Sequence, residues 1–135
     1  MYICIWVFNM KRERPTNLAI QTMALPITAY ASILHRVSGV IVWMALVVLL
    51  PLLIFALQST HNFSTLTSLF TENFLIQFIV WGLLTALGYY CLGTIKHIIQ
   101  EFGYFEELAS GCMISRVAIG LGIVLSIVIG VWIWL

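Results

Sequence analysis

Three long runs without a charged side chain constrain this sequence most. They cover residues 37–57, about 74–95 and 117–135. The hydrocarbon core of a bilayer is roughly 30 Å thick and a helix rises about 1.5 Å per residue, so about 20 residues cross it. Separate spans in lipid must be helical, because a helix satisfies its own backbone hydrogen bonds there. The sequence therefore predicts an all-α membrane protein with three transmembrane helices.

The composition agrees with this class of protein. Of the 135 residues, 62% are hydrophobic and 8% are charged, and the mean hydropathy is +1.08. Soluble domains carry about 25% charged residues, so an aqueous fold would lack polar surface. A net charge of +1 without a basic run predicts no nucleic-acid partner. The scattered cysteines, Cys4, Cys91 and Cys112, show no CxxC spacing and predict neither a disulfide framework nor a zinc site.

The basic residues predict an orientation. All of them precede or open the first run or flank the connection between the second and third; they are Lys11, Arg12, Arg14, Arg36, Lys96 and Arg116. Residues 58–73, between the first two runs, contain none. Because basic residues mark the cytoplasmic side, the N-terminus is expected inside the cell and the C-terminus outside.

The N-terminal part of the chain is expected to stay in the cytoplasm. Residues 1–9 are apolar but lack a basic region and a cleavage site, so they do not predict a signal peptide. Pro26 is expected at the start of the first helix, since proline suits the first helical turn. We therefore expect a cytoplasmic segment over residues 1–25 and the membrane anchor over residues 26–135.

Polar residues gather at the cytoplasmic end of the first span. Ser32, His35, Arg36 and Gly39 share one helix face, because residues three and four apart are neighbours. One interpretation is that Arg36 only anchors the helix by reaching toward lipid phosphates. With a hydroxyl one turn before it and an imidazole beside it, a polar binding pocket is an interpretation of at least equal weight.

The second span carries a histidine at the same end. Tyr90 and His97 are seven residues apart, so they lie along one face with roughly 10 Å between them. His97 is expected at about the depth of His35. Two histidines at matching depth on neighbouring helices favour a shared site, such as one for haem propionates or a quinone.

The third span carries small residues at a spacing of four, namely Ala118, Gly122, Ser126 and Gly130. Such a stripe lets another helix approach closely, so it predicts packing against a helix of this chain or of a partner. Trp43, deep in the first span, is expected to pack against other helices as well.

The stretch RPTNLAIQTMALPITAYASILHRVSG resembles the N-terminal signature of the cytochrome b subunits of succinate dehydrogenase (complex II). The similarity continues through WGLLTALGYY and FGYFEE, so it covers most of the chain after residue 13. The positions that match the signature are Arg14-Pro15, Asn17-Leu18, Ser32, His35-Arg36 and Ser38.

This resemblance implies a membrane-anchor subunit that is not catalytic alone. In the family, a flavoprotein subunit oxidises succinate, and an iron–sulfur subunit passes the electrons to ubiquinone. This anchor and a second small anchor form the quinone site with the iron–sulfur subunit, as parts of a heteromeric helix bundle, and hold haem b between them. The resemblance places Ser32 and Arg36 in the quinone site and His35 beside the haem. The implied location is a bacterial inner membrane, which the chain crosses several times.

One departure from the family pattern concerns the haem. The second family signature has an axial histidine, then three residues, a small residue, an apolar one, Arg and His. Aligned on TALGYYCLGTIKH, these positions hold Tyr90, Thr94, Lys96 and His97. Tyrosine can ligate ferric haem as a phenolate, and His97 is a second candidate ligand. The expectation is haem with altered ligation, or with the partner's ligand alone, ahead of no haem.

Three alternatives remain open at this point. The first is a fumarate reductase anchor with reversed electron flow. The second is a purely structural anchor without haem, which the presence of Ser32 and Arg36 disfavours. The third is a small proton-coupled transporter, which is disfavoured because no acidic residue lies deep within a span.

Overall fold

The computed structural model describes residues 25–135. The predictions for Arg14-Pro15, Asn17-Leu18 and the basic residues before them lie outside the described residues. Within the described part the chain is helical, with α2 (Ile27–Leu57), α3 (Thr60–Glu72), α4 (Phe74–Glu101) and α5 (Leu108–Trp134) and no strand. The three long helices, α2, α4 and α5, are each long and apolar enough to cross a membrane. This confirms the predicted class, an all-α membrane protein with three spans.

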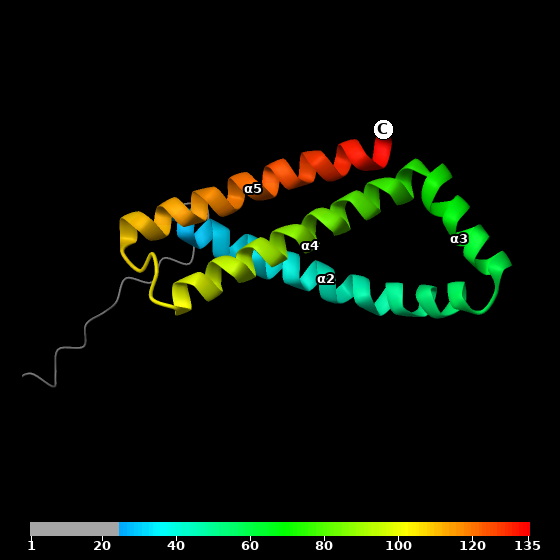
Figure 1. Cartoon of the computed structure of the whole chain (residues 1–135), viewed down its shortest axis with the longest axis horizontal. Helices are drawn as coiled ribbons and strands as arrows, with labels where there is room; N and C mark the ends of the chain where they lie inside the picture. Colours follow the sequence, from blue (N-terminus) through cyan, green and yellow to red (C-terminus); the bar gives the residue numbers. More distant parts are fainter. Residues whose placement is uncertain (1–24) are drawn as a thin grey trace, which may run out of the picture.

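Helix α4 is the centre of the bundle, because it packs against both α2 and α5. Helices α2 and α4 cross near the end where α2 begins and diverge toward the other end, where α3 joins them (Figure 1). The connection between α4 and α5 lies at the end where α2 begins, and the C-terminus lies at the end near α3 (Figure 1). The crossing of α2 and α4 is therefore at the end of the bundle that holds the predicted polar residues.

The helix ends follow from local sequence. Pro26 caps α2 from extended backbone with ψ of 155°, one residue ahead of the first helical turn. The Asn73 side chain accepts hydrogen bonds from the backbone N–H groups of Leu75 and Ile76 and so caps α4. At the other end of α4, Gly103 has a φ of +82°, and the backbone N–H of Tyr104 returns to Ile99 at 3.4 Å. This left-handed glycine closes α4 in a Schellman turn.

Helix α3 was not predicted from the sequence, which indicated only a connection over residues 58–73. The hydroxyl of Ser59 caps its first turn, accepting from the backbone N–H of His61 at 3.2 Å. Phe63, Leu66 and Phe70 line an apolar groove shared with α2. The helix is too short and too rich in Ser and Thr for a hydropathy signal, although its apolar spacing of three and four residues is typical of an amphipathic helix.

The small-residue stripe of α5 packs against α4 of the same chain. A Cβ at Gly122 would lie 2.6 Å from Cδ2 of Tyr89. One turn further, the Trp81 indole N–H donates to the backbone oxygen of Ser126 at 2.9 Å, and Gly130 also faces Trp81. The prediction of close packing is confirmed, with a partner helix inside this chain.

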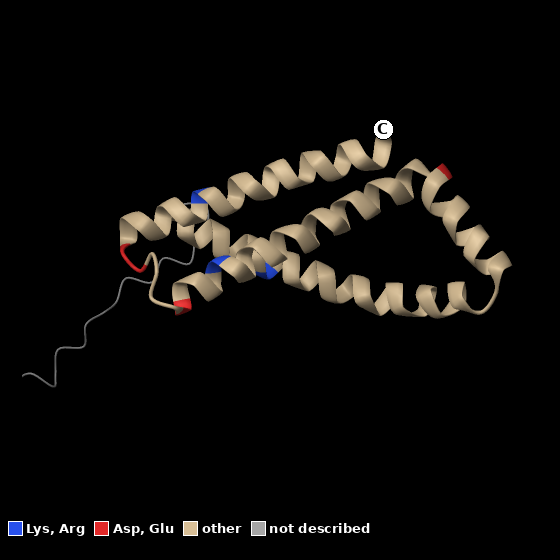
Figure 2. Cartoon of the chain, viewed as in Figure 1, with Lys and Arg blue, Asp and Glu red and all other residues tan. Residues whose placement is uncertain are grey.

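The described Lys and Arg residues lie toward the end at which α2 begins (Figure 2). Glu72, at the end of α3, lies at the opposite end of the bundle (Figure 2). The charge asymmetry that predicted the orientation is thus present along the bundle axis. The side of the membrane on which each end lies stays a prediction.

Candidate functional site

Glycines on both helices allow α2 and α4 to cross closely. Gly93 of α4 is buried, and a Cβ at this position would collide with the ring of His35. Gly39 of α2 leaves the corresponding space for Tyr90, because a Cβ there would lie 3.1 Å from Cε2 of the phenol ring. Each helix therefore receives one ring of the other in a gap left by a missing side chain.

The ring of His35 lies at the centre of this crossing. It is stacked on the ring of Tyr90, with centroids 4.9 Å apart and planes 2° apart. The ring of His97 lies against it at 5.1 Å with a tilt of 57°. Nε2 of His35 is 3.2 Å from Oγ1 of Thr94. The structure therefore brings together His35, Tyr90 and His97, the three residues that the resemblance associates with haem.

An open apolar pocket of about 490 Å³ begins beside these rings. Arg36 is exposed at this pocket, and Ser32 is half-buried one turn earlier on α2 without lining it. Trp43 also lines the pocket and is 74% exposed in the isolated chain, so the packing expected for it is not made with another helix of the described part of this chain. The side chains around the pocket are those of His35, Arg36, Gly39, Val40, Trp43, Met44 and Tyr90.

Two polar side chains of α4 lie on the buried face of that helix. Tyr89 is buried, and its hydroxyl donates to the backbone oxygen of Ala31 at 3.3 Å, which ties α4 to α2. Lys96 is 6% exposed and so lies inside the bundle, away from the open pocket. Sequence reasoning missed Tyr89, since nothing in the order of residues separates it from Tyr90 beside it.

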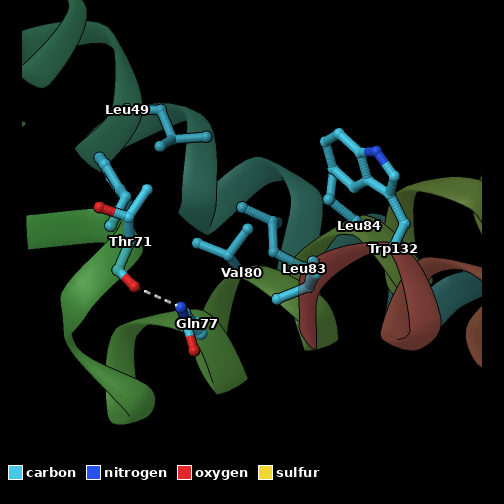
Figure 3. Close-up of a pocket in the computed structure, with 9 residues that line it drawn as sticks. Leu49, Thr71, Gln77, Val80, Leu83, Leu84 and Trp132 are labelled. Carbon is cyan, nitrogen blue, oxygen red and sulfur yellow. Dashed lines mark hydrogen bonds between the residues drawn. The ribbon is translucent and has the colours of Figure 1, made fainter. Parts of the chain in front are cut away.

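A larger pocket of about 530 Å³ lies at the opposite end of the bundle, between α2, α3, α4 and α5. Its polar feature is the amide of Gln77, which donates to the backbone oxygen of Thr71 at 2.6 Å (Figure 3). Apart from Thr71, whose hydroxyl bonds to the backbone of α3, the other side chains around it are apolar or aromatic, including Leu49, Val80 and Trp132. Because no ionisable side chain lines it, the crossing of α2 and α4 is the better candidate for a functional site. The described residues form no cluster of three His, Cys, Asp or Glu side chains.

Comparisons with a family model and with individual proteins point to the same family. A family model described as the succinate dehydrogenase/fumarate reductase transmembrane subunit matches residues 10–129. The succinate dehydrogenase cytochrome b556 subunit of Coxiella burnetii (strain RSA 493 / Nine Mile phase I) is 29% identical over 125 residues, which cover 93% of this chain and 100% of the relative. The succinate dehydrogenase cytochrome b560 subunit of Reclinomonas americana is 26% identical over 126 residues, which cover 90% of this chain and 88% of the relative.

The family model matches most of the length of the chain. The three apolar helices, with their polar crossing at one end, agree with this match. The chain therefore belongs to the succinate dehydrogenase/fumarate reductase transmembrane subunit family, as a multi-pass membrane anchor.

Proposed function

We propose that this chain anchors a succinate:ubiquinone oxidoreductase in a bacterial inner membrane and supplies Ser32 and Arg36 to its ubiquinone site. The observation that carries this proposal is the single polar cluster on the otherwise apolar helix α2, in a chain of this family. The relatives named above are subunits of succinate dehydrogenase. Succinate oxidation and the first electron transfers then belong to partner subunits, a flavoprotein and an iron–sulfur protein.

The chemistry of Arg36 and Ser32 suits a quinone. The guanidinium of Arg36 is a permanent cation with five N–H donors in a planar fork. It is exposed in the N-terminal third of α2, where it can donate to a carbonyl oxygen of a quinone ring. Ser32 adds one hydroxyl on the same helix face. The apolar wall beyond Arg36, formed by Val40 and Met44, suits the isoprenoid tail.

The exposed surface of α2 supports a second membrane anchor as a partner. Large apolar side chains there are solvent-exposed in the isolated chain, for example Val40 at 64% and Met44 at 67%. A face of this size is covered either by lipid or by another helix. The polar residues beside it favour another protein, because quinone and haem sites need walls on more than one side.

The relatives are cytochrome b subunits by name, and the pocket between α2 and α4 fits one edge of a haem b. Arg36 would hold a propionate, beside the Tyr90 ring that Gly39 allows to lie close against α2. Tyr90 is 37% exposed at the position of the axial ligand, and His97 is the other candidate ligand on α4. When bound, haem adds one-electron redox capacity to the anchor.

The quinone assignment is tested with Ser32→Ala and Arg36→Leu in the complete complex. We expect each change to lower succinate-dependent ubiquinone reduction about tenfold or more, because hydrogen bonds to charged or reacting groups are worth roughly 1.5–3 kcal/mol. Succinate oxidation with an artificial soluble acceptor should continue, since that reaction takes place on partner subunits.

Two substitutions in this chain serve as matched controls. Ser38→Ala removes a buried serine of α2 that bonds to the backbone oxygen of His35, and Arg116→Leu removes an exposed arginine of α5. Neither side chain lines the pocket beside Arg36. If the control variants lose quinone reduction as strongly as the test variants, the loss reflects assembly and the quinone assignment is wrong.

A further inference from the structure

We propose that Tyr89 is a positioning residue for the quinone site, because it fixes the turn of α2 that carries Ser32 and Arg36. Helix α5 takes part through Gly122, which holds the ring of Tyr89 in place. This inference rests on the proposed function, since it requires ubiquinone at Ser32 and Arg36. Its evidence is separate and comes from the contacts of Tyr89 with α2 and α5. Tyr89 does not line the pocket beside Arg36, so it acts on a quinone only through α2.

The hydroxyl of Tyr89 ties α4 to the early turns of α2. It donates to the backbone oxygen of Ala31 at 3.3 Å, and both residues are buried. A buried hydroxyl needs such a partner, and Ala31 provides it within the described part of the chain. Ala31 directly precedes Ser32, and Arg36 follows one turn after Ser32. The bond therefore holds the backbone from which both quinone-site side chains extend.

Two neighbouring rings of α4 hold α2 at two heights. The ring of Tyr90 lies against Gly39, and the hydroxyl of Tyr89 reaches Ala31, eight residues before Gly39. Eight residues correspond to about 12 Å along a helix. Two contacts this far apart oppose both rotation of α2 about its own axis and a change in its tilt. Without the contact at Ala31, the early turns of α2 can rotate, and the donor groups of the quinone site move with them.

Helix α5 holds the ring of Tyr89 from another side. Gly122 is buried, and a Cβ there would lie 2.6 Å from Cδ2 of the ring. Carbon atoms pack at about 3.5–4.0 Å, so only a glycine lets the ring lie where it does. One turn earlier on α4, the hydroxyl of Thr85 donates to that of Ser126 at 3.2 Å and keeps this face against α5. The ring is thus confined between α5 and α2, with its hydroxyl directed at Ala31.

Small movements of α2 matter more to a bound quinone than to the bundle. A hydrogen bond weakens steeply as its distance and angle depart from the optimum. A shift of the turn that carries Ser32 and Arg36 therefore weakens their bonds to a quinone oxygen, while most helix contacts persist. Loss of ground-state binding raises KM and leaves kcat nearly unchanged. The role of Tyr89 is thus visible as a split between these two constants.

The experiment measures kcat and KM for ubiquinone in the complete complex, with succinate as the electron donor. Tyr89→Phe removes the hydroxyl and keeps the ring. We expect it to raise the KM for ubiquinone about fivefold, as for one lost hydrogen bond, and to leave kcat within about twofold of wild type. Succinate oxidation with a soluble acceptor should be unchanged, since it takes place on partner subunits. An unchanged KM in Tyr89→Phe would show that Tyr89 does not position the quinone site.

Thr85→Val is the matched control. It removes one hydrogen bond of the same helix, between α4 and α5 and not between α4 and α2. Thermal inactivation of the complex should be accelerated to a similar degree in Thr85→Val and Tyr89→Phe, because each variant lacks one hydrogen bond between helices. Only Tyr89→Phe should raise the KM for ubiquinone. If KM rises equally in both variants, general loosening of the bundle is the cause and the inference is wrong.

The part of α5 is tested by Gly122→Ala, which forces the ring of Tyr89 out of its place. We expect a severalfold rise in the KM for ubiquinone, whereas Gly120→Ala should match wild type, because a Cβ at Gly120 meets nothing within 4 Å. Combined with Tyr89→Phe, Gly122→Ala should raise KM by less than the product of the two single effects, since both act on one contact. A full product would show that Gly122 does not act through Tyr89.

The outcomes also separate this inference from the proposed function. If Ser32→Ala and Arg36→Leu impair quinone reduction while Tyr89→Phe keeps the wild-type KM, only the role of Tyr89 is wrong. If Ser32→Ala and Arg36→Leu have no effect, the quinone site is elsewhere and the role of Tyr89 is wrong with it. Should Tyr89→Phe fail to assemble, Gly122→Ala decides. A wild-type KM in that variant then overturns the inference, and a raised KM with normal Gly120→Ala supports it.

Discussion

Tyr90 shows how one residue changes the chemistry that this anchor can support. It lies where the family pattern has an axial histidine, and its ring stacks on His35. A phenolate binds ferric iron well and ferrous iron weakly, whereas an imidazole suits both oxidation states. In the haem site that we propose, the residue at this position would decide how strongly α4 holds the haem in each redox state.

We predict that Tyr90→His gives the haem of the complex a six-coordinate, low-spin spectrum. The wild-type complex should bind carbon monoxide when reduced, because a phenolate leaves ferrous iron readily. The variant should not. Reduced-minus-oxidised spectra and carbon monoxide difference spectra measure both effects. Low-spin bis-histidine haem in the wild type would contradict the prediction, and His97→Ala would then test the remaining histidine of α4.

At the scale of elements, the helices are held together by rings placed against small residues. Tyr89 of α4 lies against Gly122 of α5 and bonds to Ala31 of α2. Gly88 of the same helix faces Leu125. Burial of large side chains contributes little, because Tyr89 is the largest side chain of the buried apolar core. Close approach and a few hydrogen bonds are what membrane helices use in place of a hydrophobic driving force.

We predict that Gly122→Leu destabilises the complex by about 1–3 kcal/mol, the usual cost of forcing extra volume into a packed contact. The added side chain would overlap the Tyr89 ring, which is already 2.6 Å from the position of a Cβ. Gly120→Leu is the matched control, since a Cβ at Gly120 meets nothing within 4 Å. Thermal inactivation of the purified complex compares the two. Equal effects at both positions would show that the contact with Tyr89 is not the cause.

Tyr89→Phe should cost about 0.5–1.5 kcal/mol, the net worth of one hydrogen bond. The change removes the bond to the backbone oxygen of Ala31 and leaves the ring in place. The same thermal measurement applies, with Tyr104→Phe as a control because Tyr104 is exposed in the connection after α4. A larger loss in the control would contradict the role of Tyr89.

At the scale of the whole molecule, the described part of the chain has a small core and a large apolar surface. The buried apolar side chains are few, whereas large apolar residues are exposed along all three long helices. A bilayer covers such a surface, and so does a second subunit. In the described part of the chain, Lys and Arg lie toward the end at which α2 begins, and Glu72 lies at the opposite end, so we expect the bundle axis to run across the membrane (Figure 2).

We predict that a cysteine placed at Ser64, on α3, reacts only with reagents added from outside the cell. A cysteine at Glu106, between α4 and α5, should react only from the cytoplasmic side. The reason is that Lys and Arg concentrate at the end of the bundle that holds the connection between α4 and α5, and basic residues mark the cytoplasmic side. Membrane-impermeant labelling of intact cells and inverted vesicles, in a background without the native cysteines, measures this. If a cysteine at Ser64 were labelled only from the inside, the predicted orientation of the chain would be wrong.

The sequence alone determined the class, the three spans and the polar end of the first two helices, because in lipid those depend on local quantities. Run length, charge position and helical spacing do not require knowledge of which helices touch. The places of His35 and His97 near the ends of their spans likewise predicted that the two side chains lie at similar depth. The family resemblance also came from sequence, since its signature is a contiguous stretch.

Only the tertiary structure decided what lies between the helices. His35 Nε2 lies 3.2 Å from Oγ1 of Thr94, which is 59 residues away in sequence. The packing stripe of α5 could have faced a partner, and its contact with Tyr89 follows from how α4 is rotated about its axis. Helix α3 forms against α2 through a few apolar side chains and the Asn62 amide bonded to the backbone oxygen of Phe55. These features depend on rotation, crossing angle and contact, which no window of sequence contains.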